Sequence, residues 1–146
     1  MEWEIIPFSG MGPIKFGMWP SEVAAIIGLP DSSDVDEMYL REYRATNLPI
    51  VSYENDRVTE IEAFYDIENV KFGGTNLFDQ PGISILSFLE RENGGARINV
   101  GTVLFEKIGI STGRLDEGVR EDHSVTAFAK GLWDDRIGRF KHISFA

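Results

Sequence analysis

The stretch from Gly10 to Pro30 (GMGPIKFGMWPSEVAAIIGLP) constrains the fold most, because it joins a strand, a turn, a helix and a stop. Residues 14–16 alternate apolar, polar and apolar, which predicts a half-buried strand. Pro20 suits a first helical position, and Gly28 can take the left-handed conformation that closes a helix. The expected apolar stripe of this helix is Val23, Ile26 and Ile27.

A strand-rich segment follows this helix. The polar stretch Asp31–Glu37 is predicted to be an acidic loop; a cation site is the alternative, because closely spaced carboxylates suit calcium or magnesium. Three antiparallel strands are then expected, with Asn55-Asp56 as a hairpin turn. They are Met38–Ala45, Ile50–Glu54 and Arg57–Asp66.

The same pattern then begins again. Val70-Lys71-Phe72-Gly73 repeats Ile14-Lys15-Phe16-Gly17, and Ser124–Asp134 echoes Arg57–Asp66 in the same order. Between these echoes a second helix is expected, with Asp79 as its cap and a stop at Asn93-Gly94. We therefore predict a tandem repeat of a β-α-β-β-β unit.

This repeat predicts a fold class. The two units, approximately residues 1–67 and 68–146, form a single domain of the α+β class, since 146 residues suit one domain. Two helices then cover one face of an antiparallel sheet, or of two joined small sheets. The other face is left open to water or to a partner.

The net charge of −10 is distributed unevenly along the chain. Residues 1–73 hold 5 Lys and Arg against 14 Asp and Glu, whereas residues 74–146 hold 9 against 10. Such a negative field repels nucleic acid and anionic membranes and favours a partner protein with a basic surface. The alternative is that the charge serves solubility alone.

The chain shows no sign of a membrane or secretory destination. No apolar run approaches the roughly 20 residues of a membrane helix, and the acidic start MEWEIIPF lacks the basic region of a secretory signal. The absence of cysteine excludes disulfides and thiolate chemistry. We expect a cytoplasmic protein.

Residues with catalytic potential form no recognisable motif. His123 and His142 lack any metal-binding spacing, and no nucleophile elbow or phosphate-binding loop is present. Glu60 and Glu62 would lie about 7 Å apart on one strand face, a separation close to that of glycosidase carboxylates. Exposed strands commonly carry acids at this spacing, so we predict no catalytic residue, cofactor or metal site.

A protein-binding surface is the stronger prediction. If Leu40 and Ile61 face the helices, the opposite sheet face presents two tyrosines, an arginine and two acids. Tyr and Arg carry much of the energy at protein interfaces, and acids select the partner. The alternatives are an ordinary solvated face, or a sheet covered on both faces, because Val58 and Phe64 fall on the polar side. The candidate partner-binding residues are Tyr39, Arg41, Tyr43, Glu60 and Glu62.

The first helical block also resembles a recurring bacterial pattern, carried by Gly17-Met18, Glu22-Val23 and Gly28-Leu29-Pro30. The pattern is similar to the helical part of the small outer-membrane assembly lipoprotein family (SmpA/OmlA). In tandem, the unit resembles the β-lactamase-inhibitor protein architecture and small bacterial immunity proteins that neutralise toxins. Trp19 stands where the pattern has Ser or Thr, and the lipoprotein's cysteine and the inhibitor's disulfides are absent. The resemblance implies a fold whose members mostly bind proteins.

Three functional hypotheses follow. The first is a non-catalytic immunity protein that occludes a basic toxin enzyme with its acidic, tyrosine-bearing sheet face. The second is a small-molecule-binding module or enzyme with a pocket between helices and sheet, rimmed by Gly73-Gly74 and by residues 113–122. The third is a structural or oligomerising domain.

Overall fold

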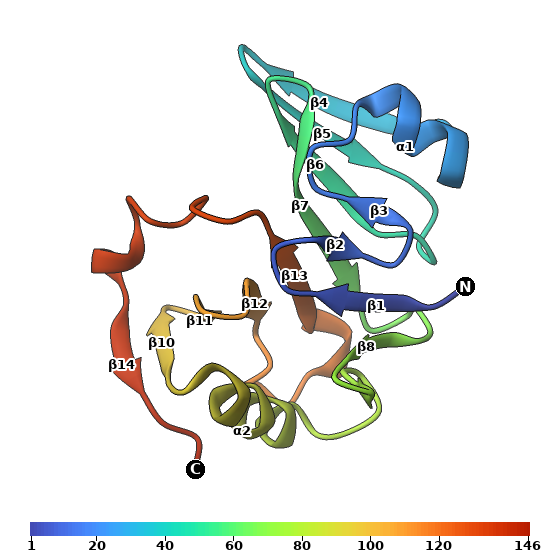
Figure 1. Cartoon of the computed structure of the whole chain (residues 1–146). Coiled ribbons are helices and arrows are strands. Elements are labelled where there is room, and N and C mark those ends of the chain that lie inside the picture. Colours follow the sequence, from blue (N-terminus) through green and yellow to red (C-terminus); the bar gives the residue numbers. More distant parts are fainter.

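One antiparallel sheet of nine strands runs through the computed structural model, which describes residues 1–146 (Figure 1). Its two halves meet where β7 pairs with β13 over five residue pairs, from Phe64 opposite Ser124 to Glu60 opposite Phe128. In order across the sheet, the strands are β14 (Lys141–Ile143), β10 (Ala96–Asn99), β11 (Thr102–Phe105), β12 (Ile110–Gly113), β13 (Ser124–Phe128), β7 (Arg57–Phe64), β6 (Ile50–Glu54), β5 (Tyr39–Tyr43) and β4 (Ser32–Asp36).

A smaller sheet and two helices lie on one side of this main sheet. Helix α1 spans Pro20–Ile27 and helix α2 spans Gly82–Asn93. Figure 1 shows α1 beside β4–β7 and α2 beside β10 and β11, with the small sheet between the two helices. In order across it, the small sheet contains β3 (Ile14–Lys15), β2 (Gly10–Met11), β1 (Trp3–Ile6), β8 (Val70–Phe72) and β9 (Thr75–Asn76).

The main core lies between these layers. It contains side chains from α1, α2, the small sheet and the inward face of the main sheet, such as Val23, Leu86, Ile5 and Ile61. Strand alternation sends Val51, Ile61 and Ala127, which are neighbours across three strands, into this core. The fold is therefore α+β, as predicted, with the helices on one sheet face.

The two halves share an order of elements. Residues 10–64 and residues 70–128 each form a hairpin, then a helix, then a four-stranded antiparallel meander. The repeated sequence motifs do not align within this order, because Ile14-Lys15 lies in the second strand of its hairpin and Val70–Phe72 in the first. An origin by duplication stays a prediction.

The prediction of a loop at Asp31–Glu37 was wrong. Residues 32–36 form β4, which pairs in register with all five residues of β5 across a tight turn at Glu37-Met38. This strand lies at the end of the sheet and every residue in it is exposed. An edge strand that buries neither face needs no apolar alternation, which is why its sequence looks like a loop.

The predicted alternation of β7 was partly wrong. Thr59 is the extra residue of a β-bulge, because Ser52 lies opposite Glu60 and Tyr53 lies opposite Val58. The bulge returns Val58 to the inward face, where it is buried with Ile61. Of Val58 and Phe64, which the sequence placed on the polar face, only Phe64 lies there.

Three further features differ from the predictions: the buried stripe of α1, the cap of α2 and the end of β13. Of the expected α1 stripe only Val23 is buried, whereas Ile26 is 39% exposed. Helix α2 begins after Pro81, and no side chain caps it, so Asp79 is not its cap. Strand β13 stops at Phe128, and the chain then leaves the sheet through turns and a short 3-10 helix, Ile137–Arg139.

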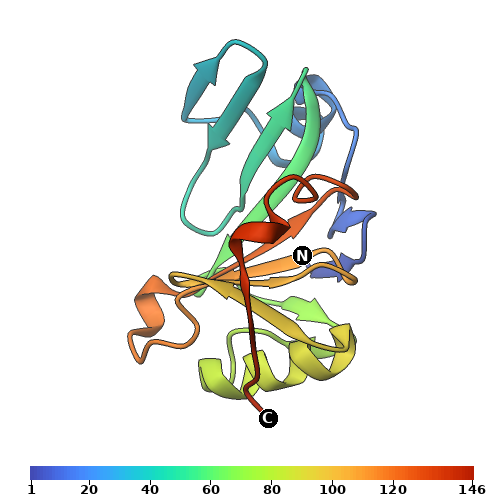
Figure 2. The same cartoon turned by 90° about the vertical axis from the view of Figure 1, so that its left-hand side faces the viewer.

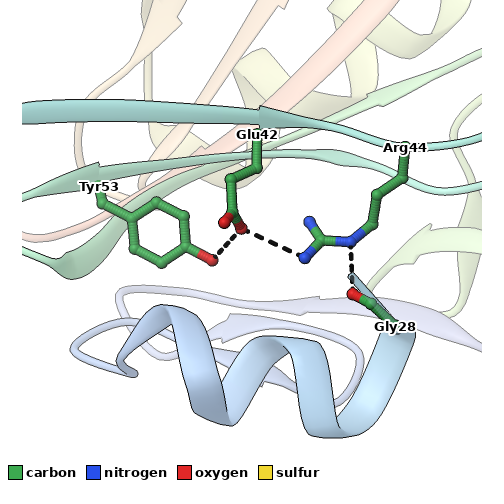
Figure 3. Close-up of polar contacts among 4 residues, drawn as sticks. All are labelled: Gly28, Glu42, Arg44 and Tyr53. Carbon is green, nitrogen blue, oxygen red and sulfur yellow. Dashed lines mark hydrogen bonds and ion pairs between the residues drawn. The ribbon is translucent and has the colours of Figure 1, made fainter. Parts of the chain in front are cut away.

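A buried polar cluster fixes the end of α1 to the sheet (Figure 3). Glu42 Oε1 accepts hydrogen bonds from the Tyr53 hydroxyl (2.6 Å) and from Arg44 Nη2 (3.2 Å). Arg44 Nε donates to the carbonyl of Gly28, directly after α1 (2.9 Å). Burial raises the pKa of the Tyr53 hydroxyl, so it stays neutral and donates to Glu42. The cluster therefore compensates for the few apolar contacts of α1.

Loss of one member of this cluster should be costly. We expect Glu42→Ala to lower the free energy of unfolding by about 3–5 kcal/mol, because it leaves the Arg44 charge buried without its partner. Arg114→Ala, which removes an exposed ion pair with Asp122, is the control and should cost less than about 1 kcal/mol. Urea unfolding measures both. Equal losses would show that the buried cluster contributes no more to the free energy of unfolding than an exposed ion pair does.

Candidate functional site

The outward face of the first-half strands carries the five residues selected from the sequence. Alternation along β5 places Tyr39, Arg41 and Tyr43 on the face opposite α1, and the registers of β6 and β7 place Glu60 and Glu62 on that same face. The structure therefore brings all five together. It also explains why they share a face: Leu40, Glu42 and Tyr53 occupy the alternate positions and turn toward α1.

Direct contacts link several of these side chains. Arg41 Nη2 lies 2.8 Å from Glu62 Oε1, and its guanidinium carbon lies 5.6 Å from the centre of the Tyr43 ring. The Tyr43 hydroxyl donates a hydrogen bond to Asp34 Oδ2 on β4 (2.8 Å), and this bond raises the pKa of Tyr43. The acidic stretch that was mistaken for a loop thus belongs to the same surface.

A second, small core holds the segment after β13 against this face. Leu104, Phe128 and Phe140 are buried there, and Trp133 packs its ring 6.1 Å from that of Phe128 and 5.8 Å from that of Phe140. Figure 2 shows the segment between β13 and β14 crossing in front of the strands, on the side away from α1. Residues 132–136 therefore form a wall beside the open strands.

The wall and the strands enclose a groove of about 550 Å³, called here the open-face groove. Five acids and two arginines line it, so its charge is negative. Tyr39, Arg41 and Glu60 are among its lining residues, while Glu62 and Tyr43 adjoin it through Arg41 and Asp34. The lining residues are Asp34, Val35, Asp36, Tyr39, Leu40, Arg41, Ser52, Tyr53, Glu54, Thr59, Glu60, Leu132, Asp135 and Arg136.

Glu60 lies where the floor of the groove meets its wall. Burial raises the pKa of its carboxyl, and the neighbouring Arg136 opposes this shift without cancelling it. Arg136 is itself held in place, since Nη2 donates to the Leu132 carbonyl (3.0 Å) and the guanidinium stacks 4.2 Å from the centre of the Trp133 ring. No pattern in the sequence indicated this wall, since residues 132–136 have neither a helix nor a strand period.

A second cavity of about 670 Å³ lies at the start of α2. His123 lines it and is 7% exposed, so it is buried and not a surface residue; its Nε2 donates to the Glu117 carbonyl (2.7 Å). The neighbouring Asp122 places its Oδ2 3.8 Å from Arg114 Nη1. Residues 115–118 form part of the rim, as the pocket hypothesis expected, but Gly73-Gly74 does not.

Neither cavity contains a cluster of side chains that could hold a metal ion. Nowhere do three or more His, Asp or Glu side chains gather closely enough to hold a metal ion, and this includes the acids of β4. Neither α1 nor α2 has the length and apolar character needed to cross a membrane. No protein-family model, curated protein or solved structure matches the chain.

The raised pKa of Glu60 makes a pH-dependent prediction. The folded protein holds this proton more tightly than the unfolded chain, so ionising Glu60 lowers the free energy of unfolding as the pH rises above the ordinary Glu pKa of about 4.3. Glu60→Gln removes this loss. We expect its stability relative to the unsubstituted protein to be higher at pH 7.5 than at pH 4.

Urea unfolding at the two pH values measures this difference. Glu37→Gln, at the exposed turn between β4 and β5, removes the same charge and is the matched control. A relative stability of Glu60→Gln that does not change with pH, once corrected by this control, would contradict the raised pKa.

Proposed function

We propose that this chain is a non-catalytic protein that binds a partner protein with a basic surface through the open-face groove. The observation that carries the proposal is the meeting of the five selected side chains beside a groove lined by five acids and two arginines. An acidic concave surface speeds association with a basic partner and selects against acidic ones.

The residue types on this face favour a protein partner. Tyr39 is 51% exposed, so aromatic surface lies among the acids. Tyr and Arg are enriched among the residues that dominate protein interfaces. Arg41 is already aligned by Glu62 and Tyr43, so little of its side-chain freedom remains to be lost on binding.

The partner class follows from the sequence resemblance to bacterial immunity proteins and to the β-lactamase-inhibitor protein architecture. We infer that the partner is a toxin enzyme with a basic active site, which the chain inhibits by covering it. The matching compartment is the cytoplasm.

Affinity capture from the source organism's lysate tests the proposal. The intact protein should retain a basic enzyme that mass spectrometry identifies, and Glu60→Lys/Glu62→Lys should bind the purified enzyme at least about tenfold more weakly, which corresponds to about 1.4 kcal/mol. The loss arises because the two substitutions replace one carboxylate in the groove and one beside it with ammonium groups, which repel a basic partner.

The control is Asp116→Lys/Glu121→Lys, which changes the net charge equally at exposed positions outside the groove. Circular dichroism checks that both variants fold. An equal loss in both variants would mean that net charge alone attracts the partner, and an unchanged affinity in both would place the interface elsewhere.

The cavity at the start of α2 favours a second candidate function, the binding of a small molecule. Its volume suits a small ligand, and its lining includes the buried His123 and the exposed Arg120. A thermal-shift screen tests it: a genuine ligand should raise the Tm of the intact protein but not of Ile83→Trp, which narrows the cavity at an exposed lining residue. Val100→Trp, outside the cavity and 91% exposed, is the control.

A further inference from the structure

The main sheet ends in an unprotected edge at β4. This strand pairs only with β5, and all five of its residues are exposed. In Figure 1 it lies in the upper part of the molecule, and no further strand of the sheet follows it. A free edge of this length is a template on which another strand can pair.

The hairpin geometry determines which backbone groups of β4 are free. A two-residue turn joins Asp36 to Tyr39, so the backbones of these two residues form a hydrogen-bonded pair. Hydrogen-bonded pairs recur at every second position of an antiparallel ladder, so Asp34 and Arg41 form the next one. Ser33 and Val35 therefore direct their N–H and C=O groups away from β5. None of the backbone hydrogen bonds outside the strand ladders and helices uses these groups.

The side chains of β4 differ between its two faces. Asp34 and Asp36 lie on the face of the open-face groove, whereas Ser33 and Val35 lie on the face of α1, in line with Glu42 and Leu40. Asp36 forms no ion pair, while Asp34 accepts a hydrogen bond from Tyr43. The edge thus presents acids to one side and an exposed valine to the other.

We propose that β4 is the docking edge for an extended basic segment of the partner protein, which adds to the main sheet as a further strand. This inference rests on the proposed function and specifies its partner. The segment alternates Lys or Arg with apolar or small residues. Its backbone bonds to Ser33 and Val35, and its alternate side chains define the register.

Charge complementarity favours this occupant. Side chains directly opposite on neighbouring strands lie about 4.5–5.5 Å apart, so basic residues opposite Asp34 and Asp36 make favourable pairs. A long basic side chain opposite Asp36 also extends toward the ring of Tyr39, which continues the same row on β5. The apolar or small residues that alternate with these basic residues pack against Val35.

A second copy of this chain is a poorer occupant of the same edge. Pairing β4 with β4 of another copy brings the carboxylates of Asp34 and Asp36 together, and like charges across strands are destabilising. The opposite edge of the sheet, β14, carries Lys141 but spans only three residues. The acids on β4 thus act against self-association while leaving the edge open to a basic strand.

Synthetic peptides test the proposal directly. The probe is a seven-residue peptide of sequence Lys-Val-Lys-Thr-Lys-Val-Lys. One control contains the same residues with all four lysines first. The other is the alternating peptide with N-methyl groups on the backbone amides that would bond to β4, which keeps the charge and removes the donors.

We expect the alternating peptide to bind at least tenfold more tightly than either control in calorimetry. Hydrogen exchange should slow at the amides of Ser33 and Val35 when it binds. On the protein side, Val35→Pro removes an outward N–H without disturbing the bonds to β5 and should abolish the difference between peptides. Val35→Thr keeps the N–H and is the matched control.

Two results would overturn the inference. Equal binding of the alternating and N-methylated peptides, or no binding of any of them, would show that no strand is added at β4. Self-association that Val35→Pro and Lys141→Glu both abolish would assign the edge to a second copy.

The same variants separate this inference from the proposed function. A captured basic enzyme that binds Val35→Pro normally but not Glu60→Lys/Glu62→Lys would refute strand addition and leave the groove as the interface. An enzyme that binds both variants normally would refute both strand addition at β4 and the groove as the interface.

Discussion

The pairing of β7 with β13 is the constraint on which the rest of the structure depends. Each meander alone has four strands and one helix, and would leave much of its apolar face uncovered. Joined antiparallel through five residue pairs, the meanders form one sheet whose inward rows meet both helices and the small sheet in one core. Because side chains alternate strictly, the same ladder determines which residues must face outward.

That outward face is only partly covered, and the covering creates the site. Phe128 ends β13 on this face and, with Leu104 and Phe140, anchors the segment that follows. Beyond this small core the strands of the first half remain open, and the anchored segment becomes the wall of an acidic groove. On the inward side, the cluster of Glu42, Arg44 and Tyr53 keeps α1 on the sheet.

Alternation and turn residues predicted the regular parts of this arrangement. Strand β6 and the Asn55-Asp56 turn lie where expected, and both turn residues have the positive φ angles that such hairpins need. The groove face was predictable for the same reason. Strand β4 was not, because an edge strand buries nothing. The wall was not, because Phe128, Trp133 and Phe140 pack together without a helix or strand period, and Leu104 of the same small core comes from β11, far away in the sequence.

The central claim is that cationic groups bind in the open-face groove and not at the cavity beside α2. An NMR titration of the ¹⁵N-labelled protein with tetralysine, with tetraglutamate as the control, tests it most directly. The account predicts that tetralysine shifts the amide signals of Asp34, Arg41, Ser52 and Glu60 in a salt-dependent way, because screening weakens exposed charge pairs. Shifts confined to residues 115–123, or spread evenly over all the acidic residues, would contradict it.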